Sequence, residues 1–273
     1  MSKFKITDLH FSYTENEPIL KGLNLELGGC TTAIVGQNGA GKTTFVKLLK
    51  GLLRPTKGKI ELDGEDIAGK TVAQIAGKVG LVFQNPNDQI FKGRVIDELL
   101  FGPHNIGMDD KKAMVQAKKA LEIVGLAGSE ESNPYDMGLS DRKMVAIASI
   151  LAMDTDVVIF DEPTIAQDYH GRETIKSIIR KLNSEGKLVL TIIHDMDFVA
   201  DCFERTIVFA KGGILLDGKT SDVFSHREEL KQAYLEPPHV TQLCNSLGFQ
   251  QTFLTVEQFV DFMKAKQAPT RHT

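Results

Sequence analysis

Short hydrophobic runs alternate with polar or glycine-rich turns along most of the chain. Residues 4–6 and 23–27 alternate apolar and polar positions, which predicts half-buried strands. Residues 31–35 form a short apolar run that leads into a glycine-rich turn. Residues 157–160 and 188–193 are apolar on both faces, as is typical of buried parallel strands. The pattern predicts an α/β fold.

Helical and turn patterns fill the intervals between these runs. A helix is predicted from residue 42 to about 53, before Pro55. Residues 58–64 predict a strand and a turn, and residues 207–216 predict a hairpin. From about 87 to 144 the chain is mainly helical, and its alanines and leucines over 109–124 recur at helical spacing. We therefore expect an α/β core interrupted by a helical insertion.

Two units are expected along the chain. The first covers residues 1–230 and includes the insertion, and the second is a small C-terminal extension over residues 231–273. In the extension, Phe259 and Phe262 lie three apart, as on one side of a helix. We expect an interaction module with an apolar face, although a tail that packs only on its own core remains the simpler alternative. That face is predicted to consist of Leu235, Val240, Leu243 and Leu247.

Composition narrows the class of protein. Hydrophobic residues make up 42% of the 273 positions and the net charge is −4, so we expect a globular protein that does not bind nucleic acid. Cys30, Cys202 and Cys244 stand singly, as reduced thiols do, and form neither a disulfide pattern nor a zinc cluster. Residues 1–9 are too polar for a signal peptide, and no apolar run approaches the roughly 20 residues that span a bilayer.

Residues 36–43 match the pattern GxxxxGK[ST] between a predicted strand and a predicted helix. Glycines let backbone N–H groups turn toward phosphate oxygens, and the helix N-terminus adds unpaired donors. Lys42 would reach the β- and γ-phosphates, and the Thr43 hydroxyl would be a ligand of Mg²⁺. A turn that merely caps a helix is the alternative, which this context disfavours. The predicted cradle consists of Gly36, Gln37, Asn38, Gly39, Ala40, Gly41, Lys42, Thr43 and Thr44.

An acidic pair, Asp161 and Glu162, follows the buried strand at 157–160. A carboxylate at the end of such a strand is where a P-loop protein holds Mg²⁺, so Asp161 is a candidate metal ligand. Glu162 is placed to orient or deprotonate an attacking water. Without the P-loop, two acids that cap a helix would be the simpler explanation.

Two further polar residues follow predicted strands. His194 ends the strand after the acidic pair, at the sheet edge where a γ-phosphate would be sensed. Gln84 lies where a strand meets the helical insertion, so it could contact Mg²⁺ or water while its loop transmits movement. Alone, each would be an ordinary structural residue.

This order of phosphate loop, glutamine loop, insertion, acidic pair and histidine resembles ABC-type ATPases, over roughly residues 3–230. The resemblance implies a P-loop NTPase with a RecA-like core and an antiparallel β subdomain, using ATP and Mg²⁺. It implies that Tyr13 stacks on adenine, although an ordinary edge-strand aromatic remains an alternative. It also implies that Asp168 belongs to the loop that crosses a dimer interface.

A closer resemblance is to the ATPases of energy-coupling-factor (ECF) importers, including the cobalt-type ones. Residues 83–91 resemble their glutamine loop, and residues 235–243 with 254–257 resemble their C-terminal extension. This implies a peripheral ATPase dimer on the cytoplasmic face of the membrane, bound to a transmembrane coupling protein. A separate membrane protein would bind a vitamin or a metal ion, and the ATPase does not reveal which.

The ABC signature, Leu-Ser-Gly-Gly-Gln, is altered in either of two possible registers. Without a gap it falls on residues 137–141, so that Gly138 replaces the serine and Asp141 replaces the glutamine, with Ser140 between them. With a two-residue deletion it falls on 139–143, and Asp141 and Arg142 replace both glycines. We prefer the gapless register. An acid about 5 Å from a γ-phosphate costs roughly 3 kcal/mol at an effective dielectric of 20, and we expect Arg142 and Lys143 to offset much of it.

Three functions follow from these patterns. The leading one is an ECF-type transport ATPase that forms half of an asymmetric heterodimer with a paralogue. The second is a structural or regulatory nucleotide-binding subunit that hydrolyses little ATP. The third, a DNA-repair or translation ABC protein, would need a long coiled coil or two ATPase domains, and this sequence has neither.

Overall fold

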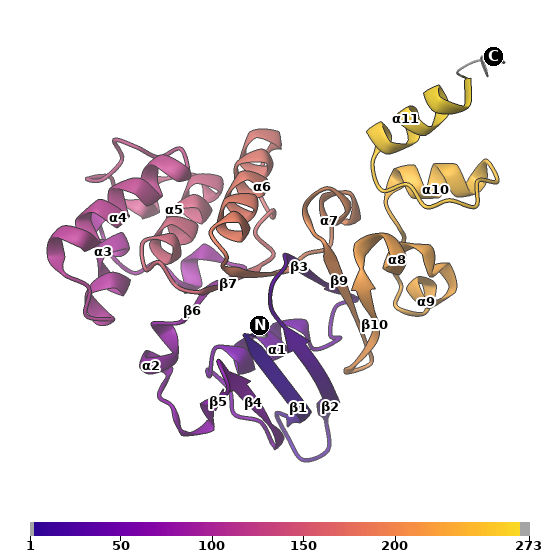
Figure 1. Cartoon of the computed structure of the whole chain (residues 1–273). Coiled ribbons are helices and arrows are strands. Elements are labelled where there is room, and N and C mark those ends of the chain that lie inside the picture. Colours follow the sequence, from indigo (N-terminus) through magenta and orange to yellow (C-terminus); the bar gives the residue numbers. More distant parts are fainter. Residues whose placement is uncertain (1–2, 268–273) are drawn as a thin grey trace.

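A six-stranded sheet lies at the centre of the computed structural model, which describes residues 3–267 (Figure 1). The strand order is β10-β9-β3-β8-β7-β6, and the strands from β9 to β6 are parallel. β10 pairs antiparallel with β9, which confirms the predicted hairpin. The strands are β3 (Thr32–Gly36), β6 (Val79–Val82), β7 (Val157–Asp161), β8 (Leu188–Ile192), β9 (Arg205–Ala210) and β10 (Gly213–Lys219).

Both faces of this sheet are buried, as the uninterrupted apolar runs predict. In β7, Val158 and Phe160 belong to a hydrophobic cluster on the helical side, whereas Val157 and Ile159 belong to a cluster on the opposite side. Successive residues of a strand point to opposite faces, so each face receives every second apolar side chain. The fold is α/β, as expected.

A four-stranded antiparallel sheet, in the order β2-β1-β4-β5, packs with α1 (Lys42–Leu49) on that opposite face. Its strands are β1 (Phe4–Ser12), β2 (Pro18–Leu27), β4 (Lys57–Leu62) and β5 (Glu65–Asp66). α1 ends four residues earlier than predicted. Gly51 follows it with φ +73°, a left-handed conformation that ends a helix. A Cβ at this position would lie 2.4 Å from Ile75 Cδ1, which favours glycine.

The helical insertion lies at one end of the central sheet (Figure 1). Its main helices are α3 (Val95–Asn105), α4 (Asp110–Ile123) and α5 (Leu139–Leu151). The helix predicted over 109–124 is confirmed as α4, and Asp109 caps its N-terminus. The predicted end of the insertion at 144 falls inside α5, because this helix packs on α3 and α4 and also on β6. Short elements connect the parts: η1 (Ile67–Gly69), α2 (Val72–Ala76), η2 (Pro86–Asp88) and η3 (Pro134–Asp136).

Residues after the acidic pair complete the core with α6 (Tyr169–Ser184), α7 (Met196–Cys202), α8 (Thr220–Ser225) and α9 (Arg227–Gln232). The predicted boundary at 230/231 lies within α9. Leu230 and Ala233 have no exposed surface and belong to the main hydrophobic cluster. The chain leaves this core only after Leu235, which packs partly against it.

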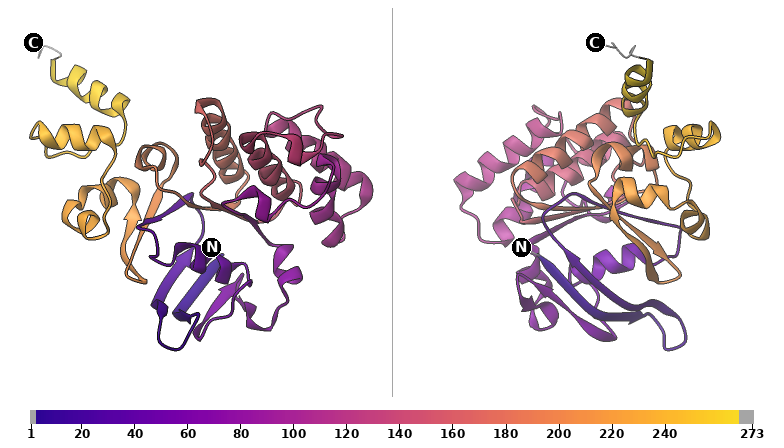
Figure 2. Two further views of the ribbon diagram at one scale, coloured as in Figure 1. Left: turned by 180° about the vertical axis from the view of Figure 1, so that it is seen from behind. Right: turned by 45° about the vertical axis from the view of Figure 1, so that its right-hand side comes forward.

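The C-terminal module, which we define as α10 (His239–Ser246) and α11 (Val256–Gln267) with their connection, projects from the core (Figure 2). Val240, Cys244 and Phe253 form its own small cluster, and Phe259 and Phe262 pack against them. The single apolar face predicted for the extension is wrong. Leu235 contacts the core and Val240 is buried in the module, while Leu243 and Leu247 are 54% and 61% exposed.

Within residues 3–267, no helix combines the length and the apolar character needed to cross a membrane.

Candidate nucleotide-binding site

The predicted site residues follow the carboxyl ends of four parallel strands. The phosphate loop follows β3, Gln84 comes two residues after β6, Asp161 ends β7 and His194 comes two residues after β8. These strands are neighbours in the order β3-β8-β7-β6, so their ends meet at one edge of the sheet. Ligands of open α/β sheets bind at this edge.

The phosphate loop has the backbone that its glycines allow. Gly36 has φ +148°, and a Cβ on it would lie 2.3 Å from the carbonyl oxygen of Phe209 on β9. Gly41 has φ +98° directly before α1, where a Cβ would lie 2.6 Å from Leu20. A side chain at either position would collide, so this loop requires glycine. A cleft of about 390 Å³ opens beside it, lined by Ile19, Asn38, Gly39, Ala40, Gly41, Lys42, Thr43, Thr44, Gln84 and Glu162.

Lys42 lies inside the loop and is 6% exposed. Its Nζ donates hydrogen bonds to the carbonyl oxygens of Gly36, at 2.7 Å, and Gln37, at 3.0 Å. Burial lowers the pKa of Lys42, and the carboxylates of Glu162 and Asp161 partly oppose this. The ammonium is therefore held inside the phosphate loop, near the carboxylates of Glu162 and Asp161.

Asp161 fits a magnesium ligand. The residue is 3% exposed, and Oδ1 has no hydrogen-bond partner among the described residues. Burial raises the pKa of its carboxyl group, and a hydrogen bond from Thr43 lowers it in part. Carboxylate and hydroxyl oxygens are the donors that Mg²⁺ prefers, and a buried carboxylate oxygen without a partner is costly unless a cation or proton meets it.

Glu162 is the point where three predicted catalytic residues meet. Gln84 Nε2 donates to Glu162 Oε2 at 2.9 Å, and His194 Nε2 lies 3.0 Å from Glu162 Oε1. The Glu162 backbone has φ +49°, a conformation that non-glycine residues adopt at a cost and that is concentrated at functional sites. Its N–H donates to Ile192 O at the end of β8, which fixes the turn.

Tyr13 reaches the phosphate-loop helix from the antiparallel sheet. Its ring is 57% exposed and packs edge-on against Phe11, and its hydroxyl lies 3.4 Å from Thr44 Oγ1. An exposed aromatic face at the rim of the cleft suits stacking on a nucleobase.

Residues 138–141, where the sequence analysis places the signature, lie at the start of α5. Gly138 is the N-cap without a side-chain cap, Ser140 Oγ donates to Gln167 Oε1 at 3.0 Å, and Asp141 is exposed. In this chain these residues lie apart from the phosphate cleft, whose lining contains none of them. Asp168 caps α6 by accepting a hydrogen bond from Gly171 N at 2.8 Å. The exposed Ile165 lies in the same loop as Asp168.

The two cations that follow Asp141 make their described hydrogen bonds to other parts of the chain. Arg142 donates to the carbonyl oxygens of residues 134, 135 and 137 and to Asn87 Oδ1. Lys143 instead points into the protein and donates to the carbonyl oxygens of Phe83 and Gln84. Both side chains thus connect α5 to neighbouring loops of the same chain.

Sequence reasoning placed Lys143 near Asp141 but missed its contact with the glutamine loop. Lys143 is 1% exposed, and burial lowers its pKa to about 8 against the opposing effect of Asp161 and Glu162. Gln89 also connects the segment after Gln84 to α5, since its Nε2 donates to Ala146 O at 2.7 Å. The available signal was a lysine directly before the apolar run 144–148, where a buried helix face begins.

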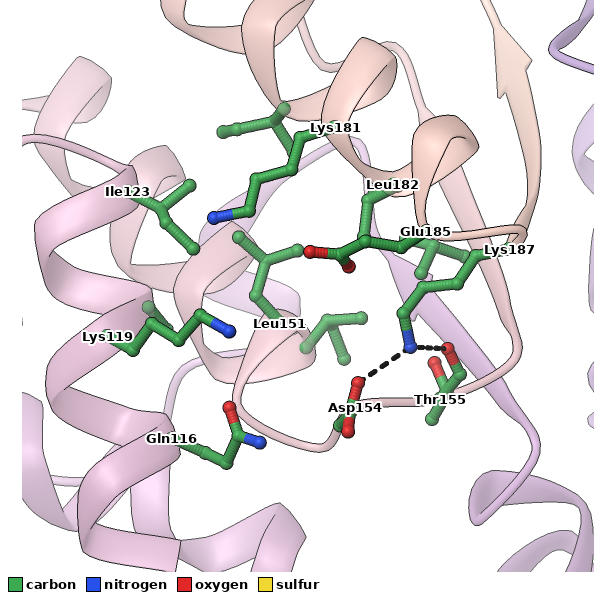
Figure 3. Close-up of a pocket in the computed structure, with 14 residues that line it drawn as sticks. Gln116, Lys119, Ile123, Leu151, Asp154, Thr155, Lys181, Leu182, Glu185 and Lys187 are labelled. Carbon is green, nitrogen blue, oxygen red and sulfur yellow. Dashed lines mark hydrogen bonds and ion pairs between the residues drawn. The ribbon is translucent and has the colours of Figure 1, made fainter.

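A separate hollow lies between α4, α5 and α6 (Figure 3). Its floor is apolar, and Lys187 at its rim pairs with Asp154 at 2.7 Å and donates to Thr155 O at 2.9 Å. It contains none of the predicted site residues and has no glycine-rich backbone for phosphate, so the nucleotide site is at the sheet edge.

Comparisons with known proteins agree with this geometry. Residues 20–165 match the family model described as ABC transporter. The EcfA2 ATP-binding protein of an energy-coupling factor transporter, from Clostridium perfringens, is 38% identical over 274 residues, covering 97% of this chain and 96% of that protein. The EcfA protein of Methanocaldococcus jannaschii is 37% identical and covers 88% of each chain. A Methanosarcina acetivorans protein is 41% identical, but this chain spans only 43% of its length.

Solved structures show the same fold. That of cbiO1 from Clostridium perfringens, described as part of the ABC transporter complex cbiONQ, has a TM-score of 0.75 and 27% identity, covering 96% of this chain and 99% of that one. A bacterial Atm1-family ABC exporter with ATP bound has a TM-score of 0.70 and 26% identity over 81% of this chain and 39% of the exporter. The expected P-loop NTPase fold and the resemblance to ECF and cobalt-type ATPases are confirmed, and the chain belongs to the ATP-binding domains of ABC transporters, a family of ATPases.

Proposed function

We propose that this chain is the ATP-hydrolysing subunit of an ECF-type importer, working as half of an asymmetric heterodimer at the cytoplasmic face of a membrane. The observation that carries the proposal is the position of Glu162, which Gln84 and His194 hold at the edge of the phosphate cleft. The sequence similarity to EcfA proteins supports the transporter class.

Each residue has a defined task in this mechanism. The loop N–H groups and Lys42 bind the β- and γ-phosphates, and Tyr13 stacks on adenine. Thr43 and Asp161, with Gln84, would hold Mg²⁺, which neutralises phosphate charge when bound. Glu162 orients the attacking water and accepts its proton, and His194 keeps the carboxylate in place while contacting the γ-phosphate.

Two exposed surfaces are suited to binding the membrane partner and the second ATPase subunit. Phe91 and Phe101, 54% and 42% exposed, stack edge to face on the insertion next to the glutamine loop, with Lys92 over both rings. Exposed aromatic side chains next to the glutamine loop are suited to binding the transmembrane coupling protein. On the C-terminal module, the exposed Leu243 and Leu247 suit the second subunit. A separate membrane protein would bind the vitamin or metal ion.

Co-purification from membranes tests this function. We expect the tagged chain to bring a transmembrane protein and a paralogous ATPase, and the complex to hydrolyse ATP. Lys42→Ala should weaken ATP binding about 10- to 100-fold, because the phosphates lose a charge-assisted donor. ATP binding by Lys42→Ala equal to that of the parent, measured by equilibrium titration, would reject the phosphate-loop assignment.

The altered signature favours one alternative, a nucleotide-binding subunit that is mainly structural or regulatory. In that case the complex would assemble and bind ATP, but Glu162→Gln would leave its turnover unchanged because the partner's site would do the hydrolysis.

A further inference from the structure

Lys143 is a buried cation under the glutamine loop. Its Nζ donates to Gln84 O at 2.5 Å and to Phe83 O at 3.0 Å, from the first turn and a half of α5. No described carboxylate forms an ion pair with it. A buried ammonium is costly, and an apolar side chain of equal length would fill the same space at lower cost. The ammonium therefore contributes what an apolar chain cannot, namely donors that fix the loop backbone.

The loop backbone fixed in this way carries the side chain that reaches the acid. Gln84 accepts from Lys143 through its carbonyl oxygen and donates to Glu162 Oε2 through Nε2. His194 approaches the other carboxylate oxygen. Two consecutive contacts, from Lys143 to Gln84 and from Gln84 to Glu162, thus connect α5 to the carboxylate that directly follows β7.

We propose that Lys143 is a positioning residue for hydrolysis: its ammonium fixes the backbone of Gln84, and Gln84 in turn fixes the carboxylate of Glu162. The inference rests on the proposed role of Glu162 as the general base. It adds that α5 sets the orientation of this base in its own subunit, through a contact that touches neither nucleotide nor water.

The chain offers a matched control for the loss of a lysine–backbone contact. Lys50 is also partly buried, and its Nζ donates to Val79 O at the start of β6, the strand whose other end leads to Gln84. Burial lowers its pKa as well. Lys50→Met therefore removes a comparable lysine–backbone contact at the opposite end of β6 from the glutamine loop.

The experiment compares these variants in the assembled, membrane-extracted complex. Lys143→Met should lower kcat by about 10-fold or more while the Kd for ATP changes less than about 2-fold, because the loss falls on the reaction and not on binding. Lys50→Met should leave kcat within about 2-fold of the parent. In a Gln84→Ala background, Lys143→Met should lower kcat by less than about 2-fold further, since its effect passes through the Gln84 side chain.

Several results would overturn the inference. These are an unchanged kcat for Lys143→Met, an equal fall in kcat from Lys50→Met, or an equal fold-loss from Lys143→Met with and without Gln84→Ala. Lys143→Leu, which also lacks a donor, replaces Lys143→Met if the latter does not fold, and failure of both to fold would show a structural role instead. Glu162→Gln separates the two proposals: if it lowers turnover while Lys143→Met does not, the general base stands and the positioning role is wrong.

Discussion

At the scale of single residues, the site combines buried charges that depend on one another. Lys42 and Asp161 are both nearly fully buried, and each shifts the pKa of the other toward its charged form. Glu162 is different, because its backbone is in the left-handed region and its two oxygens are already engaged by Gln84 and His194. We therefore expect ATP binding and hydrolysis to depend on separate side chains, which substitutions can distinguish.

Glu162→Gln should leave ATP binding intact while slowing hydrolysis by about 10²–10⁴-fold, the range for loss of a general base. The amide keeps the size of the side chain but cannot accept the proton. Turnover and ATP affinity in the assembled complex check this expectation. His194→Ala should also reduce turnover more than affinity, and a larger effect of either change on affinity would contradict the assigned roles.

At the scale of elements, the C-terminal module contacts the core at His239 and at Leu254 in the connection between its helices. His239 begins α10, its backbone N–H donates to Asp197 Oδ1 at 2.9 Å, and its ring pairs with the same carboxylate. Asp197 lies in the first turn of α7, three residues after His194. A cleft of about 620 Å³ separates this attachment from Glu162 and His194. The module is thus joined to α7, the helix that directly follows His194 and Asp195.

Attachment of the module should depend on pH. The Asp197 carboxylate, chiefly by a hydrogen bond, raises the pKa of His239 above 6.5, with Asp195 and Glu236 adding to the effect. Because the folded pKa is the raised one, this stabilisation is fully present below pH 6.5 and is lost as the pH rises through the folded pKa. Hydrogen exchange of α10, corrected for intrinsic rates, should show less protection at pH 8.5 than at pH 6. His239→Gln should remove the difference, and an undiminished difference would show that another group titrates.

Removal of residues 239–273 should weaken association with the second ATPase subunit and leave ATP binding within about 2-fold of the parent, since the module lies outside the phosphate cleft. The cut belongs after residue 238, because a cut at 230 would remove Ala233 from the main cluster. Leu243→Asp with Leu247→Asp provides a milder variant at exposed positions. Association measured by analytical ultracentrifugation that is unchanged in both variants would reject the module as an interface.

At the scale of the whole molecule, the phosphate loop, Asp161, Glu162 and His194 fit the sequence pattern of ABC ATPases, whereas residues 137–143 differ from Leu-Ser-Gly-Gly-Gln in either register of the sequence analysis. An ABC dimer forms each ATP site from the phosphate loop of one subunit and the signature of the other. A paralogue with an unaltered signature would therefore complete the site on this chain's phosphate loop. The second site would use this chain's residues 137–143, where Asp141 is exposed.

The lone chain should therefore be a weak ATPase whose turnover rises strongly when a paralogous partner is added. Within the heterodimer, Glu162→Gln should remove most of the activity, and the equivalent change in the partner should remove little. Steady-state ATP turnover of the chain alone, of the pair and of both single variants tests this asymmetry. Strong hydrolysis by the lone chain, or equal losses from the two changes, would show that the altered signature still supports hydrolysis.

The sequence by itself determined the strands, the hairpin, the helix over 110–123 and the phosphate loop. These features depend on residues close together in the chain: apolar spacing, glycines at positive φ and a strand–loop–helix order. Only the tertiary structure decided which loops meet. Gln84 and Glu162 are 78 residues apart, and they touch because β6 and β7 are adjacent in a sheet whose strand order is not the sequence order.

The direction of side chains on helices was likewise a tertiary outcome. The sequence placed Lys143 beside Asp141, but the packing of α5 turned it inward onto the glutamine loop, 59 residues away. The sequence suggested one apolar face for four residues of the extension, yet contacts with the core and with the phenylalanines of the module divided them between buried and exposed positions. The spacing of apolar residues along the chain indicates which of them share a helix face. The neighbouring elements decide which face is buried, because a side chain is buried only where another apolar surface packs against it.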